Sequence, residues 1–588
     1  MKNILYKNHI WFFVLLLGML SCKPDEDFLK AIPKTFYTID NAFSTSAQVD
    51  QAVVAIYSQL RNVWANPNGD NWACVFRGNG TDMYDVPSIG LGHSFNNYGN
   101  INPGDANFNS AFSTWYQIIA KANLAIYSAG LPTITWASQT DKAYTIAQAR
   151  FFRAFAYRNL AELFGGVPIV TEISTTAQYD FTRATRVETY QYAIDELLAI
   201  ENDLPITTAV GGRLVKGAAQ HNLCELYLAL GTQLAADSKA ADAQAAFTQS
   251  INYGNKVIDG GTYSLMTSRF GSRKTESSIT INVYKSGIAG SPVDTIQAKT
   301  NVYWDLFQEN NVNYQDGNKE CIWAMQIDYA AYKAEDKMSK LPNTRAYGAD
   351  FRDASPTNLT GTLEDVGGRG IVIVIPTMYT RDAIYADKWG DDMRNSEIVL
   401  RRIFKGNVST SPYYKKPLPW AVLYNNKNNQ SLAYPISCKI ATDKFTGLAD
   451  GENMSNLFRD DYFIRLPETI LLRAEAKQRS GDKAGAAADI NLLRDRANCS
   501  YRVTAADMDD NFNTILDERA RELVYEECRW NTLLRMGGTI AVDRIKKYAY
   551  WPTAQATLTF NYNLWPIPQT VIDANKDVKL EQNPGWNR

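Results

Sequence analysis

The sequence predicts a mostly α-helical fold, a solenoid of helix pairs like tetratricopeptide repeats, interrupted by a large irregular insertion with short β-strands. Three observations support this prediction. Apolar residues recur at helical spacing within about 40–258 and 459–540, two units share a small-residue spacing typical of packed helix pairs, and residues 259–458 lack clear helical periodicity. A solenoid also explains how 588 residues can form a single domain.

Four helices are predicted in the first part of the chain. Their apolar positions follow one helix face within residues 49–60, 115–122, 149–163 and 187–198. Residues 44–46 offer N-cap side chains for the first helix. Gly165, Gly166 and Pro168 end the third helix, and Pro205 follows the fourth.

The repeat signal comes from small residues at positions where two helices would touch. Ala243 follows Gly231 by 12 positions, and Phe247 comes four residues later, as in a tetratricopeptide unit. Ala474 and Ala486 repeat the same 12-residue spacing. Small side chains let two helix backbones approach closely, so we expect a tight helix pair at each unit.

The insertion at 259–458 is rich in Gly, Asn, Tyr and Pro, and its 200 residues are too many for solenoid connectors. Residues 320–327 and 371–375 are predicted to form short buried strands. We expect the insertion to pack on the helical scaffold, where loops on a rigid support commonly hold functional residues.

One long helix is predicted from about 513 to 535, before a C-terminal segment at 541–588. Two oppositely charged pairs at i, i+3 spacing lie on it, Glu518 with Arg521 and Glu526 with Arg529. We interpret these charges as a salt-bridge network. The other interpretation, acid/base catalysis, lacks a visible partner in a pocket.

Composition argues against several function classes. The chain has 60 Lys+Arg against 62 Asp+Glu, a net charge of −2, which does not favour nucleic-acid binding. Its 3 His leave little material for a metal site or a Ser-His-Asp triad. Asp391 and Asp392 could bind Ca²⁺ but lack EF-hand spacing. These residues give no support for a metal site or a catalytic triad, and we expect no metal.

The first 21 residues are predicted to be a signal peptide. Lys2 and Lys7 precede an apolar run at 10–20, which is 11 residues long and too short to span a bilayer at about 20 residues per crossing. Cys22 follows directly, as in the lipobox of bacterial lipoproteins, so we expect Cys22 to be acylated and to anchor the chain in a membrane. The alternative is a soluble secreted protein.

Six further cysteines follow Cys22, and none is in CxxC spacing, which argues against a zinc or redox motif. Six cysteines allow 15 disulfide pairings, so the sequence leaves the connectivity open. Cys224 and Cys321 lie in apolar runs, and we predict buried thiols for both.

Residues 465–476 resemble the helix signature of the SusD/RagB family, the surface nutrient-binding lipoproteins of Bacteroidetes. Further segments are similar to the family in the same order: 28–33, 115–123, 149–168, 518–530, 564–568 and 582–586. The resemblance spans nearly the whole mature chain, 22–588. Cys528, Asn531 and Thr532 depart from the usual late helix.

The resemblance implies a lipid-anchored outer-membrane protein on the cell surface. It implies a SusC-like TonB-dependent transporter as the partner, and an oligosaccharide or another oligomeric nutrient as the ligand. It implies neither catalysis nor a cofactor. The acidic residues at 25–27 are similar to the surface-export signal of Bacteroidetes lipoproteins.

The family motifs do not identify a ligand site. Sugars require aromatic rings beside polar groups, so loops that combine the two are the candidates. Two clusters meet this requirement, within 72–98 and within 329–351. The predicted ligand-binding residues are Trp72, Phe76, Arg77, Asp82, Tyr84, Tyr98, Tyr329, Tyr332 and Tyr347.

Two other functions stay open at this point. A surface glycoside hydrolase needs two carboxylates about 5–10 Å apart across a cleft, and Asp and Glu are plentiful in the chain. A tetratricopeptide-type interaction scaffold would bind a protein on a concave helical surface. The large insertion favours ligand capture over a bare scaffold. The sequence does not identify the nutrient.

Overall fold

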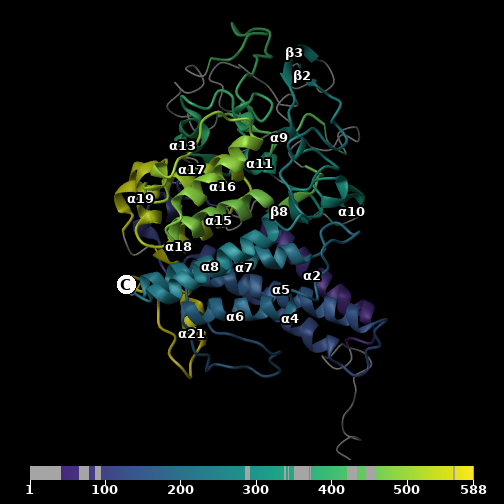
Figure 1. The fold of residues 1–588 in the computed structure, drawn as a ribbon, viewed down its shortest axis with the longest axis vertical. Coiled ribbons are helices and arrows are strands. Elements are labelled where there is room, and N and C mark those ends of the chain that lie inside the picture. Colours follow the sequence, from purple (N-terminus) through teal and green to yellow (C-terminus); the bar gives the residue numbers. More distant parts are fainter. Residues whose placement is uncertain are drawn as a thin grey trace, which may run out of the picture.

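The structure is a computed structural model of the chain. It describes residues 42–64, 78–85, 94–284, 292–334, 336, 339–341, 343–349, 370, 372–419, 434–444, 446, 457–559 and 563–586. Helices dominate the lower part of the molecule, and irregular chain with short strands forms the upper part (Figure 1).

In the described structure, six long helices form the first part of the scaffold, and each packs on the next along the chain. In addition, α2 contacts α5, and α5 contacts α7. The helices are α2 (Ser46–Trp64), α4 (Ala106–Ala129), α5 (Gln139–Phe164), α6 (Arg186–Ile200), α7 (Lys216–Ala236) and α8 (Ala240–Ile258). All four helices predicted from periodicity in this region are present.

Local signals place the helix ends. Asp105, Ser138 and Thr185 cap α4, α5 and α6 through their side-chain oxygens, and Thr185 forms a capping box with Glu188. Gly165 ends α5 with a φ of 77°, a left-handed conformation that glycine adopts without strain. The exit turn predicted from Gly165 is confirmed.

The solenoid continues after the insertion. Helix α8 packs directly on α15 (Leu466–Arg479), and α15 packs on α16 (Lys483–Arg496), although about 200 residues separate α8 from α15. A Cβ at Gly231 would lie 2.6 Å from the Phe247 ring, which confirms the close α7–α8 contact predicted from this spacing. The fold is therefore mostly α, with a tetratricopeptide-like helical scaffold.

Short antiparallel strand pairs occur in the upper region. The strands are β1 (Tyr84–Asp85), β2 (Ser278–Tyr284), β3 (Pro292–Lys299), β4 (Cys321–Met325), β5 (Ile375–Pro376), β6 (Leu400–Arg401), β7 (Ile436–Ser437) and β8 (Asp461–Arg465). They pair as β1–β5, β2–β3, β4–β8 and β6–β7. The strand predicted within 320–327 is confirmed as β4, whereas 371–375 contributes only the start of β5.

Short helices connect these strands and close the chain. They are α9 (Val302–Asp305), α10 (Tyr329–Lys333), α11 (Asn343–Tyr347), α13 (Met378–Arg381), α19 (Ile540–Tyr548), α20 (Pro552–Thr557) and α21 (Gln569–Ala574). The C-terminal segment returns to the end of α5, where Trp565 N–H donates to Leu163 O at 2.7 Å. Asn583 Nδ2 donates to the carbonyls of Phe164 and Trp565.

The single helix predicted from 513 to 535 is wrong, because the chain breaks into α17 (Asn513–Leu523) and α18 (Arg529–Met536). Tyr525 has a left-handed φ of 63°, which interrupts the helix. Its N–H donates to the Tyr84 hydroxyl at 2.7 Å.

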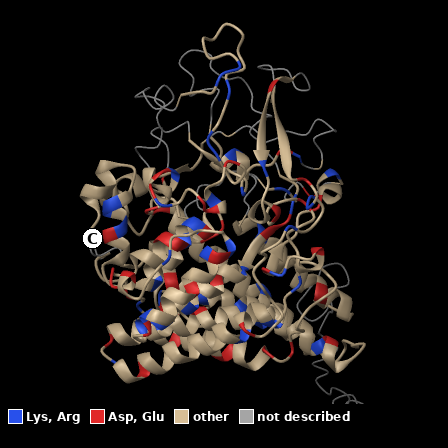
Figure 2. Ribbon diagram, turned by 45° about the horizontal axis from the view of Figure 1, so that its top comes forward, with Lys and Arg blue, Asp and Glu red and all other residues tan. Residues whose placement is uncertain are grey.

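The charges around this break form a buried ion-pair network, as Figure 2 shows in the interleaved blue and red residues of the central helices. Glu518 pairs with Arg521, as predicted. The predicted Glu526–Arg529 pair is not found; Glu526 contacts Arg465 and Lys439 instead. The break between the helices turns Arg529 toward the segment at 78–85.

The described cysteines are free thiols: Cys224, Cys321, Cys438, Cys499 and Cys528. Cys224 and Cys321 are buried, as predicted. Cys22 and Cys74 lie outside the described residues. In the part of the chain that the structure describes, we find no helix with the length and apolar content needed to cross a bilayer.

Candidate ligand-binding site

Two tyrosines of α10 form a partly exposed aromatic surface. Tyr329 and Tyr332 are three residues apart, so they share one helix face, and their rings stack at 6.3 Å between centroids and 21° between planes. Phe458 supports both rings from the interior, at 4.7 and 4.9 Å. Asp328 caps α10 by accepting from Ala330 N and Ala331 N. The cap and Phe458 fix the orientation of this tyrosine pair.

A groove of about 340 Å³ lies beside the tyrosine pair. Helix α2 forms one wall, and the end of β4, Phe463 in the middle of β8 and a glycine-containing loop form the other. Its lining residues are Val54, Tyr57, Ser58, Arg61, Gly211, Gly212, Arg213, Ala324, Met325, Gln326, Asp336 and Phe463. We call this cavity the α2 groove.

Asp336 links the α2 groove to the tyrosine pair. Its carboxylate accepts from Arg61 Nη2 at 2.9 Å across the groove. Its backbone N–H donates to Ala331 O of α10 at 2.8 Å. Ser339 Oγ accepts from Asp328 N at 2.6 Å, which folds the chain after α10 back onto the helix. The tyrosine pair and the α2 groove are therefore adjacent surfaces.

The wall of the groove is held rigidly by paired polar groups. Tyr57 Oη donates to Gln148 Oε1 at 2.8 Å and accepts from Leu214 N at 2.9 Å. Burial raises the pKa of Tyr57 well above its usual range, so its hydroxyl stays protonated. Arg213 forms a bidentate pair with Asp50, and hydrogen bonding to that carboxylate raises the pKa of Arg213.

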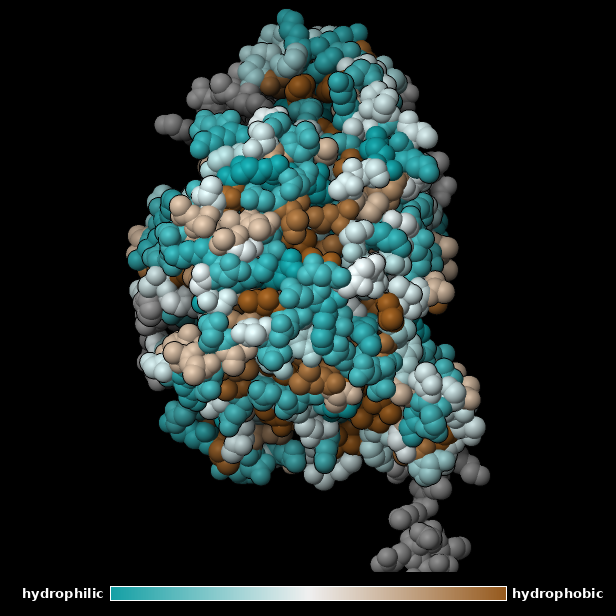
Figure 3. Space-filling model, in the orientation of Figure 1, coloured by the Kyte–Doolittle hydropathy of each residue, from teal (hydrophilic) through white to brown (hydrophobic). Residues whose placement is uncertain are grey.

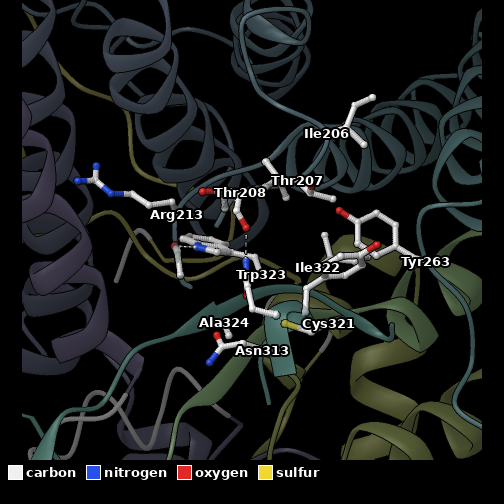
Figure 4. Close-up of a pocket in the computed structure, with 14 residues that line it drawn as sticks. Ile206, Thr207, Thr208, Arg213, Tyr263, Asn313, Cys321, Ile322, Trp323 and Ala324 are labelled. Carbon is white, nitrogen blue, oxygen red and sulfur yellow. Dashed lines mark hydrogen bonds between the residues drawn. The ribbon is translucent and has the colours of Figure 1, made fainter. Parts of the chain in front are cut away.

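The loop at 206–213 is held in place by Trp323 of β4 (Figure 4). Trp323 Nε1 donates to Gly212 O at 2.8 Å. Gly212 has a φ of 77°, and a Cβ there would lie 2.5 Å from Gln326 Cγ. Any larger residue would push this loop away from the groove.

The predicted residues of the first cluster fall into two groups. Trp72, Phe76 and Arg77 lie outside the described residues. Asp82, Tyr84 and Tyr98 are buried in the interior, where they leave no surface for a ligand. They therefore act in the core of this structure.

Asp82 is held by two guanidinium groups. Its carboxylate accepts from Arg529 at 2.6 and 2.8 Å and from Arg544 at 2.9 Å. Burial alone would raise the pKa of Asp82, but the charges of Arg529 and Arg544 outweigh burial and lower it to about 2. Asp82 is fully buried and its carboxylate already accepts three hydrogen bonds from guanidinium groups, so it does not face a ligand.

The buried tyrosines have structural contacts. The rings of Tyr84, Tyr347 and Tyr525 pack together, and the Tyr84 centroid lies 6.0 Å from that of Tyr347 and 5.5 Å from that of Tyr525. Tyr98 donates its hydroxyl to Gly80 O. Tyr347 of the second cluster is buried in the same aromatic group. The structure thus brings Tyr84 and Tyr347 together as core residues. Of the described predicted residues, only Tyr329 and Tyr332 lie at the surface.

The α2 groove does not follow from sequence reasoning. Tyr57 falls on the apolar face of the first predicted helix, and Arg61, Arg213 and Asp336 belong to no local pattern. Their contacts join residues 163 and 275 positions apart, and only the fold brings such residues together. The glycine pair before Arg213 is the one available signal.

The chemistry of this site is suited to binding. Among its lining residues the single carboxylate is Asp336, which is paired with Arg61. In the described part of the chain, no group of three or more His, Cys, Asp or Glu residues could hold a metal ion. Aromatic rings, guanidinium groups and an exposed Gln326 are available as partners for a ligand.

Two family models match this chain at its two ends. One is described as the SusD family and covers residues 419–586. The other is described as "Starch-binding associating with outer membrane" and covers residues 37–228. A SusD-like protein P2 of Formosa agariphila is 24% identical over 99% of this chain and 100% of its own length. This chain is a SusD-like protein.

The starch-binding protein SusD of Bacteroides thetaiotaomicron is 25% identical to this SusD-like protein, over 75% of this chain and 72% of its own. A crystal structure of a SusD homolog from the same organism matches with a TM-score of 0.67 at 16% identity, covering 93% of this chain and 98% of that one. A laminarin-binding SusD-like protein matches with a TM-score of 0.61 at 20% identity, covering 92% and 100%.

Proposed function

We propose that this SusD-like protein captures oligosaccharides at the cell surface and delivers them to a SusC-like TonB-dependent transporter. The observation that supports it most directly is the stacked pair Tyr329 and Tyr332 beside the α2 groove. Sugar rings present apolar C–H faces to aromatic rings and hydroxyls to guanidinium, amide and carboxylate groups. The site offers both kinds of partner on adjacent surfaces.

Relatives named for starch and laminarin binding support an oligosaccharide as the ligand. Trp72, Phe76 and Arg77 are proposed as further contacts, because the chain that holds them begins directly after Trp64 at the end of α2. The α2 groove lies along the same helix.

The membrane part of the proposal depends on Cys22. We propose that residues 1–21 are removed, that 22–588 forms one domain, and that acylation of Cys22 anchors it to the outer membrane. The matched family described as associating with the outer membrane supports this location. Radiolabelled palmitate should be incorporated by the native chain in cells and not by Cys22→Ser.

The ligand is tested by calorimetry of the purified protein against a panel of neutral oligosaccharides, including maltoheptaose and laminariheptaose. We expect saturable binding to at least one oligosaccharide and no change in its chain length. Product formation by the purified protein would support the glycoside hydrolase alternative instead.

The partner is tested by affinity purification from solubilised outer membranes. We expect a TonB-dependent barrel in stoichiometric amount. A peripheral or cytoplasmic partner in its place, with no oligosaccharide binding, would support the interaction-scaffold alternative.

A further inference from the structure

A second, larger cavity lies in the lower, helical part of the molecule, away from the candidate ligand site. We call this part of the molecule the helical base. Its volume is about 530 Å³, and it lies between α4, the chain after α5 and the C-terminal helix α21. Its lining residues are Asn109, Phe112, Ser113, Tyr116, Pro168, Val170, Gln178, Tyr179, Phe181, Thr570, Val571, Ala574, Asn575 and Leu580. We call it the α21 cavity. Figure 1 shows α21 at the lower left of the molecule, near α6.

Helix α21 is attached at its two ends and has no fully buried residue of its own. At one end, Thr570 Oγ1 donates to Asn109 Oδ1 at 2.8 Å. At the other, Asn575 accepts from Phe181 N and donates to Phe181 O, both at 2.9 Å. The cavity lies between these attachments, so Val571 is only partly covered.

The lining of the α21 cavity favours an apolar occupant. Phe112 and Tyr116 stack at 4.8 Å, and the Tyr116 hydroxyl donates to Pro168 O at 2.6 Å. The amide of Asn575 is also fully used by its backbone partners. Because these polar groups already have hydrogen-bond partners within the protein, they are not available to sugar hydroxyls. Transfer from water into the cavity is therefore more favourable for apolar side chains than for a sugar. Figure 3 shows that apolar patches occur among hydrophilic surface over the helical base as well as over the upper region.

We propose that the occupant is the chain's own N-terminal segment at 28–32, with Phe28, Leu29 and Ile32 entering the α21 cavity. These residues belong to the chain before Ala42, which the described structure does not include. They follow a charged stretch at 23–27 and supply three large apolar side chains within five positions. Removing these apolar side chains from water favours their burial against the apolar lining of the cavity.

The length of the N-terminal chain agrees with this docking. Phe43 packs at the far end of α4 from the cavity, in a cluster with Val49 and Ala129. The distance along α4 from Tyr116 to Ala129 is about 20 Å at 1.5 Å per residue. With Ile32 docked, the ten residue steps from Ile32 to Ala42 span up to about 33 Å when fully extended. The segment therefore reaches the cavity with length to spare.

Docking would determine how closely the molecule sits to its membrane. Only residues 23–27 would stay between Cys22 and the docked segment, a span of about 17 Å. The helical base would then face the membrane. The orientation toward the membrane depends on the proposed lipid anchor at Cys22. The docking of residues 28–32 in the α21 cavity does not depend on it.

The first test is a pair of cysteine substitutions in the complete chain, produced in its own membrane. We expect Leu29→Cys and Val571→Cys to form an intramolecular disulfide that mass spectrometry detects in the joined peptides. Leu29→Cys with Leu492→Cys is the matched control, because Leu492 is exposed on α16, outside the cavity lining. Equal cross-linking of both pairs, or none in the first, overturns the proposal.

The second test measures the labelling rate of Val571→Cys by a water-soluble maleimide, read at the level of the peptide. Replacing Phe28 and Leu29 by serine should raise this rate about tenfold, because the docked segment would no longer cover the site. The rate at Leu492→Cys should not change. A Val571→Cys rate that is the same in both backgrounds overturns the proposal, and oligosaccharide binding is expected to be unaffected throughout.

Discussion

The carboxylate of Asp82 forms a bidentate ion pair with the guanidinium of Arg529, which follows 447 positions later in the chain. Both side chains are completely buried. The segment at 78–85 is buried along its whole length and is tied to α18 by this pair and by Trp530 Nε1, which donates to Asn79 O at 2.9 Å. The pair therefore connects the first aromatic cluster to the C-terminal helices.

Removing Asp82 should destabilise the fold strongly. Asp82→Ala leaves Arg529 and Arg544 buried without their shared carboxylate, and breaking a buried pair in this way costs about 3–5 kcal/mol. The urea midpoint measures the loss. The matched control is Asp509→Ala, whose exposed partner is Lys483 and whose expected cost is below about 1 kcal/mol. Similar midpoints for the two variants would contradict the structural role of Asp82.

Stability should fall in acid because of the same carboxylate. The pKa of Asp82 is about 2 in the folded protein, against 3.8 ordinarily, so the folded state releases its proton more readily than the unfolded state. The stabilisation is therefore present above about pH 4 and is lost as the pH falls through 2. Glu475 and Glu522, each with a pKa lowered to about 2, lose stabilisation over the same range. Urea midpoints between pH 5 and pH 2.5 measure this loss, and a midpoint that stays constant over that range would refute it.

Glu162 should have the opposite pH dependence. Burial, followed by the charge of Glu225, raises its pKa to about 7 from 4.5. In the described structure its Oε1 accepts no hydrogen bond, while Oε2 accepts from Asn531. The folded state binds this proton more tightly, so its stabilisation is complete below pH 4.5 and is lost as the pH rises through 7.

Glu162→Gln should consequently raise stability at pH 8 by on the order of 2 kcal/mol and change it little at pH 4.5. Thermal unfolding at the two pH values measures the difference. Glu172→Gln, on the exposed chain after α5, is the control and should be neutral at both. A destabilised Glu162→Gln variant at pH 8 would show that the charged form is needed.

The helical scaffold could be predicted from sequence because its signals are local. Apolar spacing located α2, α4, α5 and α6, and the Gly231–Phe247 contact followed from a single repeat spacing. The break before α18 could not be predicted, because the Tyr525 N–H donates to a hydroxyl of Tyr84, 441 positions away. A local pattern contains no information about such a partner.

The candidate site was harder to predict for the same reason. Aromatic residues next to polar residues in the sequence are typical of a sugar-binding surface, but they are equally typical of a loop that packs into the core. Tyr84 and Tyr347 belong to the second class, since they pack together and against Tyr525. Tyr329 and Tyr332 stay at the surface because Phe458 occupies the interior side of α10.

The close α7–α8 contact predicts an unusual response to alanine. Helix propensity alone favours Gly231→Ala by about 1 kcal/mol. A Cβ there would lie 2.6 Å from the Phe247 ring, however, and overpacking costs about 1–3 kcal/mol. We expect a lower unfolding temperature for Gly231→Ala and partial recovery in the double variant with Phe247→Leu, because the Ala243 carbonyl oxygen would still lie 3.1 Å from the new methyl group. Gly390→Ala should be close to neutral, because in the described structure no atom other than those of its chain neighbours lies within 4 Å of the position that its new methyl group would occupy.

The tyrosine pair gives the sharpest test of the proposed binding site. Tyr329→Ala and Tyr332→Ala should each weaken affinity for the best oligosaccharide of the panel by up to about tenfold, since aromatic contacts are worth about 0.5–1.5 kcal/mol beyond the area they bury. Tyr→Phe at either position should preserve most of the affinity, because the ring face remains. Tyr127→Ala, on the exposed side of α4, is the matched control.

The measurement is titration calorimetry, with circular dichroism to establish that each variant is folded. Because Phe458 packs against both rings, loss of one tyrosine exposes part of Phe458, and a modest fall in stability is expected alongside the loss of affinity. The two effects separate in Phe458→Leu, which should lower stability while keeping the tyrosine faces. Unchanged affinity in folded Tyr329→Ala and Tyr332→Ala proteins would place the oligosaccharide elsewhere on the molecule, with Trp72 as the next residue to replace.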